Sequence, residues 1–228
     1  MVDYFPLVGS IIAAIFTVLL LTQYLKRRKM HQLLWTVAIA LWFITMLFEF
    51  LSDPELVGGN PTMYKLFYVL AATLVGLMGA GSLYLLTHKP WGKYFLLYVI
   101  AVFIPFIALG LTASVDTAML TEGFKTAGKA MPSHVRIFSP LLTIPGGIFL
   151  IGGAVYSFWL DTTKKYNLLI ALGGIFPLMG GSLARAGDIT LFYAFDTIGA
   201  LLLFIGFLLS MEYIKRKEEK KEEDETED

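Results

Sequence analysis

Cysteine is absent from this chain of 228 residues. Its absence excludes disulfides, thiolate chemistry, iron–sulfur clusters and cysteine-based zinc sites. Charge is also scarce: Asp, Glu, Lys and Arg make up 16% of the residues, against roughly 25% in an ordinary soluble domain. Because 57% of the residues are hydrophobic, the composition predicts that most of the chain lies in a lipid bilayer.

Histidine is nearly as scarce, with only His31, His88 and His134. All three fall at the predicted edges of the membrane, so none is placed to hold haem or a catalytic metal inside it. A metal-dependent hydrolase needs clustered histidine and carboxylate ligands. The sequence also lacks a glycine-rich phosphate loop and a nucleophile elbow. We therefore expect no enzyme activity, no metal and no cofactor.

What the chain has in abundance is long apolar stretches. A membrane-spanning helix needs roughly 20 mostly apolar residues, and seven stretches meet this requirement. They predict an all-α integral membrane protein, a seven-helix bundle whose transmembrane domain covers residues 1–213. The helices are expected at 6–25, 31–52, 63–87, 93–113, 137–160, 166–186 and 189–213.

Basic residues gather in every second connection between these helices. Thirteen of the 18 Lys and Arg residues fall on one side, in the first, third and fifth connections and in the tail after the last helix. Because Lys and Arg are retained on the cytoplasmic side, we expect an outer N-terminus and a cytoplasmic C-terminus. The predicted location is the cell membrane, with multiple spans.

The tail, 214–228, is a separate charged segment. Its last fourteen residues hold five basic and eight acidic groups, a charge density that cannot bury a core. We expect it to continue the last helix for a turn or two and then to remain solvated. The alternative is a docking site for a basic partner.

The longest outer connection, about 114–136, has its own pattern. Apolar residues recur in it at steps of three and four: Met119, Leu120, Phe124, Ala127 and Met131. This spacing predicts a short amphipathic helix at the outer interface, which would cap a cavity open to the outside.

A few ionisable residues fall at membrane depth, where charge is costly and often functional. The sharpest is Asp196, about two turns inside the last helix. Glu49 lies near the outer end of the second helix, with Thr45 and Trp42 on the same face. The candidate site for a ligand or ion comprises Glu49, Lys65, Arg136, Arg185 and Asp196. The alternative is that these groups form structural ion pairs or extend to the interface from helix ends.

The sixth predicted helix is rich in glycine around a proline. Its candidate hinge residues are Gly173, Gly174, Pro177, Gly180 and Gly181. Because proline removes a backbone hydrogen bond, we expect this helix to be kinked or broken near its middle. The alternative is that the glycines allow close helix packing. In the third helix, Ala72, Gly76 and Ala80 predict a packing stripe inside the bundle.

Two resemblances bear on function. Seven helices with an outer N-terminus are similar to microbial rhodopsins, whose retinal needs a lysine in the last helix. The stretch 191–211 contains no lysine, so a retinal pigment is not expected.

The chain also resembles the seven-transmembrane sensor region of archaeal and bacterial histidine kinases. The likeness lies in Leu41-Trp42 through Phe48-Glu49-Phe50-Leu51, in 64–68, and in 173–180. No kinase or other output domain follows Met211. The resemblance therefore implies a stand-alone sensor, or a subunit that signals through a partner, with an outward-facing pocket near Glu49, Arg185 and Asp196.

Three functions remain open from the sequence. The leading hypothesis is a receptor-like bundle that binds a small ligand or ion from the outer side and signals through a cytoplasmic or membrane partner. The second is a transporter or channel that uses Asp196 and Glu49 for protons or cations. The third is a membrane scaffold, which predicts a fully paired polar cluster with no cavity beside it. Besides the lipid bilayer, we expect no nucleic acid partner.

Overall fold

The computed structural model describes the backbone at residues 2–87, 90–121, 123–124, 128–186 and 189–227. Side chains are described over the same ranges apart from 181–190, 218 and 220–227.

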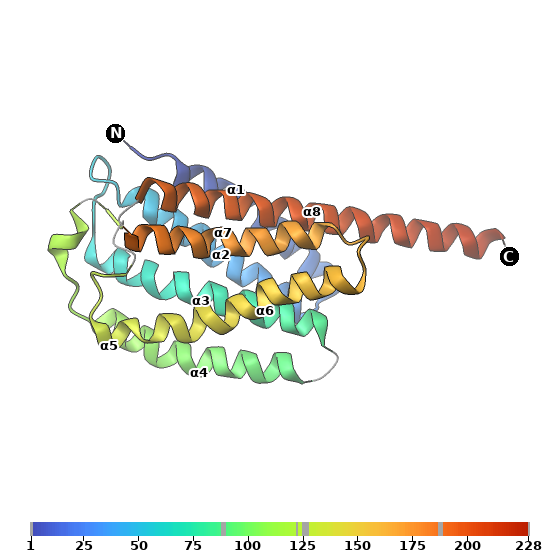
Figure 1. Ribbon diagram of the computed structural model, residues 1–228, viewed down its shortest axis with the longest axis horizontal. Coiled ribbons are helices and arrows are strands. Elements are labelled where there is room, and N and C mark those ends of the chain that lie inside the picture. Colours follow the sequence, from blue (N-terminus) through green and yellow to red (C-terminus); the bar gives the residue numbers. More distant parts are fainter. Residues whose placement is uncertain (1, 88–89, 122, 125–127, 187–188, 228) are drawn as a thin grey trace.

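The described chain consists of helices joined by short connections, and the long helices run back and forth along one axis (Figure 1). In chain order they are α1 (Phe5–Arg27), α2 (Met30–Leu51), α3 (Pro61–Leu86), α4 (Trp91–Thr112), the 3-10 helix η1 (Thr117–Leu120), α5 (Ser133–Arg136), α6 (Phe138–Leu160), α7 (Tyr166–Ala186) and α8 (Ile189–Glu227). Each of the seven predicted apolar stretches forms a helix.

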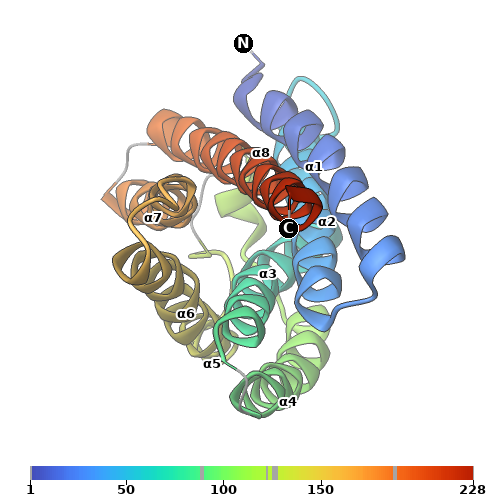
Figure 2. The ribbon, with the colours of Figure 1, turned by 90° about the vertical axis from the view of Figure 1, so that its right-hand side faces the viewer.

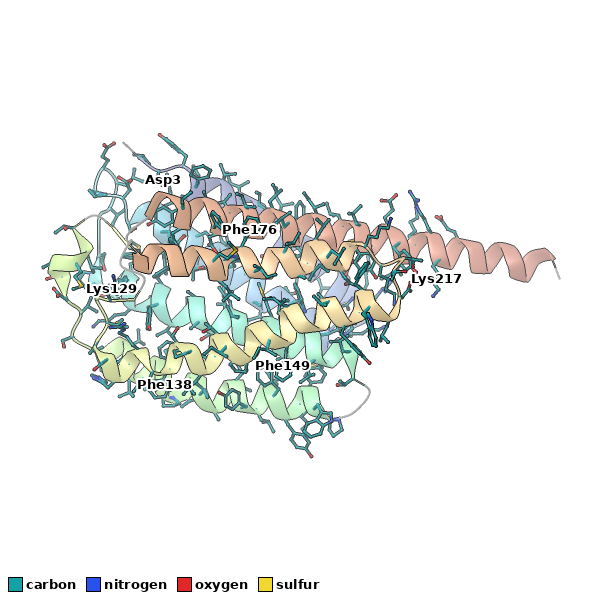
Figure 3. All side chains as sticks on the ribbon, viewed as in Figure 1. Asp3, Lys129, Phe138, Phe149, Phe176 and Lys217 are labelled. Carbon is teal, nitrogen blue, oxygen red and sulfur yellow. The ribbon has the colours of Figure 1, made fainter. Side chains whose placement is uncertain are left out.

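We call the end of the bundle where α1 begins the N-terminal end, and the end where α1 stops the tail end. Asp3 and Lys129 lie at the N-terminal end, whereas Lys217 lies beyond the tail end (Figure 3).

Local signals set where helices start and stop. Asn60 caps α3, because its Oδ1 accepts from the backbone N–H of Thr62 and Met63. Arg28 ends α1 in the left-handed conformation, with φ of 52°.

The outer surface of the bundle is apolar along the helices. Within the described residues, six helices are long and apolar enough to cross a membrane, and the seventh, the 166–180 part of α7, is apolar but shorter. Large apolar side chains are exposed on α1 and α4, among them Ile11, Ile15, Val18, Leu97, Ile100 and Ile104. Water disfavours such a surface and lipid accepts it. The architecture is that of an α-helical membrane bundle.

Six helices close into a ring. Going round it, α1 packs on α2, α2 on α3, α3 on α6, α6 on α7, α7 on α8, and α8 on α1. The fourth helix packs outside this ring, mainly on α3 (Figure 2). The ring is filled by buried side chains from five of its helices, including Phe16, Ile39, Met46, Met78, Leu150 and Leu203. A ring of this kind can enclose space along its axis.

Glycine allows α7 and α8 to approach most closely. A Cβ atom at Gly173 would lie 2.7 Å from the Leu203 backbone nitrogen, and one at Gly199 would lie 2.6 Å from Pro177 Cδ. A Cβ at Gly206 would lie 3.1 Å from the backbone oxygen of Tyr166. These distances leave no room for a side chain, so α7 and α8 form one tightly packed pair. In α3, the Ala72, Gly76 and Ala80 stripe is buried as predicted.

The sequence predicted that α7 is kinked or broken near Pro177. A break is not present, because α7 continues through Pro177 from Tyr166 to Ala186, and a kink stays a prediction. A proline in a helix removes one backbone hydrogen bond, but α7 is held along its length by the close contact with α8. Likewise α6 continues through Pro145.

The amphipathic helix predicted in the 114–136 connection is also wrong for the residues described. The segment forms η1, then turns, then α5. Gly123 and Gly128 have φ of 84° and 85°, a conformation that interrupts any right-handed helix. The apolar residues still face inward, since Leu120, Phe124 and Met131 are buried. Ala127 lies outside the described residues.

The charged tail is helical for longer than the turn or two predicted. The last helix runs without interruption to Glu227, so it extends beyond the rest of the bundle (Figure 1). Opposite charges at i,i+4 spacing support it: Lys215 pairs with Glu219 at 3.4 Å, and Arg216 pairs with Glu212. Such pairs stabilise an exposed helix.

The glycine contacts of the α7–α8 pair predict a packing defect on substitution. Gly199→Ala should lower the free energy of unfolding by roughly 1–3 kcal/mol, because the added methyl overpacks a close helix contact. Thermal unfolding of the detergent-purified protein measures this. Gly152→Ala is the control, since a Cβ there meets no atom within 4 Å. An equal loss in both variants would contradict the close contact.

Candidate functional site

A cavity of about 210 Å³ lies inside the ring, lined by one face of α2 and by α3, α6, α7 and α8. We call it the carboxylate cavity. Trp42, Thr45 and Glu49 all line it, as their helical spacing on α2 predicted, and Asp196 lines it from α8. The structure thus places the two acidic residues singled out in the sequence beside one space.

The two carboxylates differ in their partners. Asp196 Oδ2 accepts a hydrogen bond of 3.0 Å from Trp42 Nε1, which joins α2 to α8. Glu49 is 4% exposed, and its Oε2 has no hydrogen-bond partner within the described chain. A buried carboxylate without a partner is costly. Glu49 is therefore ready to accept from a donor or to hold a cation.

Aromatic side chains form much of the remaining wall. Those that line the carboxylate cavity are Trp42, Phe67, Tyr68, Phe124 and Phe192. Their faces attract cations at short range. No Lys or Arg is among the described residues that line this cavity. Its chemistry suits a small cation.

The connection between α4 and α6 covers the cavity through Phe124. The ring of Phe124 lies 5.2 Å from the rings of Tyr64 and Phe67. Its backbone N–H donates to Ser52 Oγ at 3.1 Å, and Ser52 in turn donates to the Glu49 backbone oxygen. The segment that covers the cavity is therefore hydrogen-bonded to the end of α2 that carries Glu49. This segment is a loop and not the predicted helix.

The basic residues of the predicted cluster lie elsewhere. Lys65 donates to the backbone oxygen of Leu111 at 3.1 Å and so satisfies the end of α4. Arg136 is exposed at the end of α5. The side chain of Arg185 lies outside the described residues. A cluster in which Lys65 and Arg136 pair with both acids is not formed.

The predicted hinge residues divide between the cavity and the helix contact. Gly173, Gly174 and Pro177 line the carboxylate cavity. A Cβ at Gly180 would lie 3.2 Å from the Phe192 backbone oxygen on α8. The side-chain environment of Gly181 is outside the described part. Gly173 and Gly180 serve close packing, and a hinge motion stays a prediction.

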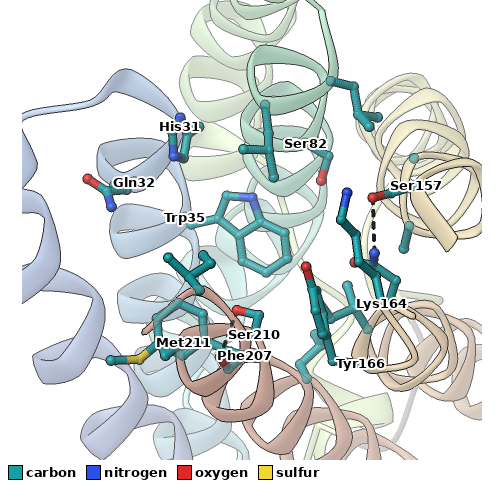
Figure 4. Close-up of a pocket in the computed structure, with 18 of the residues that line it drawn as sticks. His31, Gln32, Trp35, Ser82, Ser157, Lys164, Tyr166, Phe207, Ser210 and Met211 are labelled. Carbon is teal, nitrogen blue, oxygen red and sulfur yellow. Dashed lines mark hydrogen bonds between the residues drawn. The ribbon is translucent and has the colours of Figure 1, made fainter. Parts of the chain in front are cut away.

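A second and larger cavity was not predicted from the sequence. It has a volume of about 820 Å³ and opens between α1, α2, α3, α6, α7 and α8 toward the tail end. We call it the tail-end cavity. Side chains from several helices point into it, including Trp35, Ser82, Ser157 and Tyr166 (Figure 4). The sequence signal was a set of uncharged polar residues near the tail ends of five helices: Gln32, Ser82, Ser157, Asn167 and Ser210.

The two cavities approach each other along the axis of the ring. Leu150 and Leu203 line both of them. Both leucines are almost fully buried, at 3% and 1% exposed. They form an apolar constriction between a carboxylate-lined space and a space that opens at the tail end.

The acidic pair does not make a metal centre on its own. Among the described residues, no group of three or more His, Asp or Glu side chains converges to hold a metal ion. The scaffold hypothesis predicted a fully paired cluster with no cavity, whereas Glu49 Oε2 is unpaired and the carboxylate cavity is present. The arrangement can bind a small cation or exchange protons at two carboxylates.

The hydrogen bond between Trp42 and Asp196 predicts a stability effect. Trp42→Phe should lower the free energy of unfolding by about 1–3 kcal/mol, because it leaves a buried carboxylate without its donor. Thermal unfolding measures this, with Trp159→Phe as the control because Trp159 is 74% exposed. A double-mutant cycle with Asp196→Ala separates the hydrogen bond from lost packing. Zero coupling in that cycle would count against the bond.

No family model, no curated protein and no solved structure matches this chain. What it binds therefore has to be inferred from its own residues and their geometry.

Proposed function

We propose that this protein is a receptor-like membrane protein that binds a small organic cation in the carboxylate cavity and signals through its charged tail. The class of ligand follows from the cavity wall. Two carboxyl groups, Glu49 and Asp196, can carry negative charge opposite a bound cation, and five aromatic side chains supply faces that attract cations. At about 210 Å³ the space suits a small amine better than a drug-sized molecule, for which pockets are roughly 300–1000 Å³.

One observation carries the signalling part of the proposal. Asp196 and the charged tail belong to a single uninterrupted helix, α8, which runs from Ile189 to Glu227. A displacement of α8 at Asp196 is therefore transmitted along a rigid element to residues beyond the bundle. At 1.5 Å per residue, the helix between Asp196 and Lys217 is about 30 Å long.

The moving unit is the α7–α8 pair. Close contacts at Gly173, Gly199 and Gly206 hold these two helices against each other. We therefore expect them to move together. The Trp42 hydrogen bond holds α8 to α2 at Asp196. A cation that competes for the Asp196 carboxylate weakens this link and lets the pair shift. A ligand produces such a shift only when it favours one arrangement over the other.

The proposal includes a topology. We propose seven spans, with the N-terminal end of the bundle outside the cell membrane and the tail in the cytoplasm. In the sequence, thirteen of the 18 Lys and Arg residues fall in the first, third and fifth connections or in the tail, which is the side that positive charge marks as cytoplasmic. In this orientation the carboxylate cavity is nearer the outside, and the tail presents its charges to a cytoplasmic or membrane partner.

A panel of matched amines and alcohols tests the ligand class. Phenethylamine should raise the melting temperature of the detergent-purified protein, whereas 2-phenylethanol, which has nearly the same shape and no charge, should not. A hundredfold excess over the dissociation constant stabilises the native state by about 2.7 kcal/mol. Asp196→Asn should lose the response to phenethylamine.

Glu55→Gln is the control variant, because Glu55 is an exposed acid at the same end of the bundle and does not line the cavity. It should respond like the parent. No shift with any amine, or an equal shift in Asp196→Asn, would show that the cavity does not bind cations through Asp196.

Transport of protons or cations is the second candidate function. It is favoured by the two cavities that meet at Leu150 and Leu203, because they lie along the bundle axis on either side of this apolar constriction. Vesicles containing the protein distinguish the two functions when a proton or potassium gradient is imposed. The receptor proposal expects no flux above empty vesicles. Flux in the parent that Asp196→Asn abolishes would establish transport instead.

A further inference from the structure

We propose that the tail-end cavity binds an anionic amphiphile, with one apolar chain inside the ring and a negatively charged head at the basic rim. This site is distinct from the carboxylate cavity, and it has the opposite charge. Among the described residues, Leu150 and Leu203 line both cavities.

The shape of the tail-end cavity suits a chain. Its deep end is formed by Leu20, Trp35, Leu150 and Leu203, and its rim includes Lys215. Leu203 and Lys215 lie twelve residues apart on α8, which corresponds to about 18 Å of helix. The deep walls are apolar, so they would hold a hydrocarbon chain more favourably than water.

The rim of the cavity is basic. Of the Lys, Arg, Asp and Glu residues that line it, three are basic and one is acidic: Arg27, Lys164, Lys215 and Glu212. They come from the tail ends of α1 and α8 and from the connection before α7. His31 also lines the rim (Figure 4). Lys215 pairs with Glu219 at 3.4 Å, but exposed ion pairs are weak, so a negatively charged head can compete for this lysine. A positively charged head would be repelled by the basic side chains.

Asp161 is the partner of Lys164 at the rim. The backbone N–H and the hydroxyl of Thr163 donate to Asp161 Oδ1 at 3.1 and 2.5 Å, and Lys164 Nζ lies 3.4 Å from Oδ2. The hydrogen bond from the Thr163 hydroxyl holds the pKa of Asp161 below its ordinary value, so it is ionised at neutral pH. Exposed ion pairs of this kind are weak, and Lys164 can turn toward a stronger anion.

An independent observation points to a ligand. Gln32 is 7% exposed, lines the cavity in the first turn of α2, and its Oε1 has no hydrogen-bond partner within the described chain. A buried polar group without a partner is costly. Rotation of the amide presents an N–H in place of the oxygen, so Gln32 can donate to a carboxylate or phosphate oxygen placed between it and the basic rim.

A brominated fatty acid tests the proposal directly, because bromine quenches tryptophan fluorescence at close range and Trp35 lines the cavity. The probe is 9,10-dibromooctadecanoate, added to protein purified in an uncharged detergent. We expect saturable quenching in the parent and loss of the saturable part in Trp35→Phe. The methyl ester of the same acid has no charge and should give only the non-saturable quenching caused by partition into the micelle.

Charge variants distinguish binding at the rim from non-specific attraction of the acid to exposed lysines elsewhere on the protein. Lys164→Gln with Lys215→Gln should weaken the saturable binding at least tenfold. Lys26→Gln with Lys93→Gln is the matched control, because both lysines are exposed and do not line the cavity. It should bind like the parent. Melting curves establish that each variant is folded.

Three results would overturn the proposal. Equal quenching by the acid and its ester would show that the head is not recognised. Saturable quenching that persists in Trp35→Phe would place the probe elsewhere. Full displacement of the acid by millimolar inorganic phosphate would show that the rim binds a free anion and that the chain is not required.

Discussion

The arrangement of this protein depends on two carboxylates buried in an apolar ring. Burying Asp196 and Glu49 is unfavourable unless the surroundings compensate, and the structure offers one hydrogen bond, from Trp42 Nε1 to Asp196. That bond is also the link between α2 and α8 across the ring. Whatever changes the charge or the partner of Asp196 therefore changes how α8 is held, so in our proposal the binding site and the switch are one feature.

The packing of the ring determines which helices a change at Asp196 would reach. The helices α7 and α8 pack closely at Gly173 and Gly199, and α8 continues from this contact into the charged tail. The space on the ring axis is divided at Leu150 and Leu203. One cavity is acidic and aromatic, the other is basic at its rim and apolar inside. Ligands of opposite charge bound in the two cavities would contact the α7–α8 pair toward its two ends.

Much of this could be predicted from the sequence, because it follows from periodicity. Apolar stretches gave the helices, and spacing of three and four placed Trp42, Thr45 and Glu49 on one face. The partners of the acids could not be predicted, since which bases meet them depends on helix rotation. Lys65 and Arg136 face away, toward the end of α4 and solvent.

Two local errors have physical causes as well. Glycines at positive φ interrupt the helix that was predicted around Phe124. Ion pairs at i,i+4 prolonged α8 past the point where apolar residues end. The tail-end cavity was missed because empty space depends on how side chains pack.

Because the chain has no cysteine, nitroxide labels can be placed cleanly at Lys26→Cys and Lys217→Cys. The decisive measurement is the distance distribution between them by double electron–electron resonance, with and without Asp196→Asn. Coupling along α8 predicts a shifted distribution in the variant, and identical distributions would contradict it.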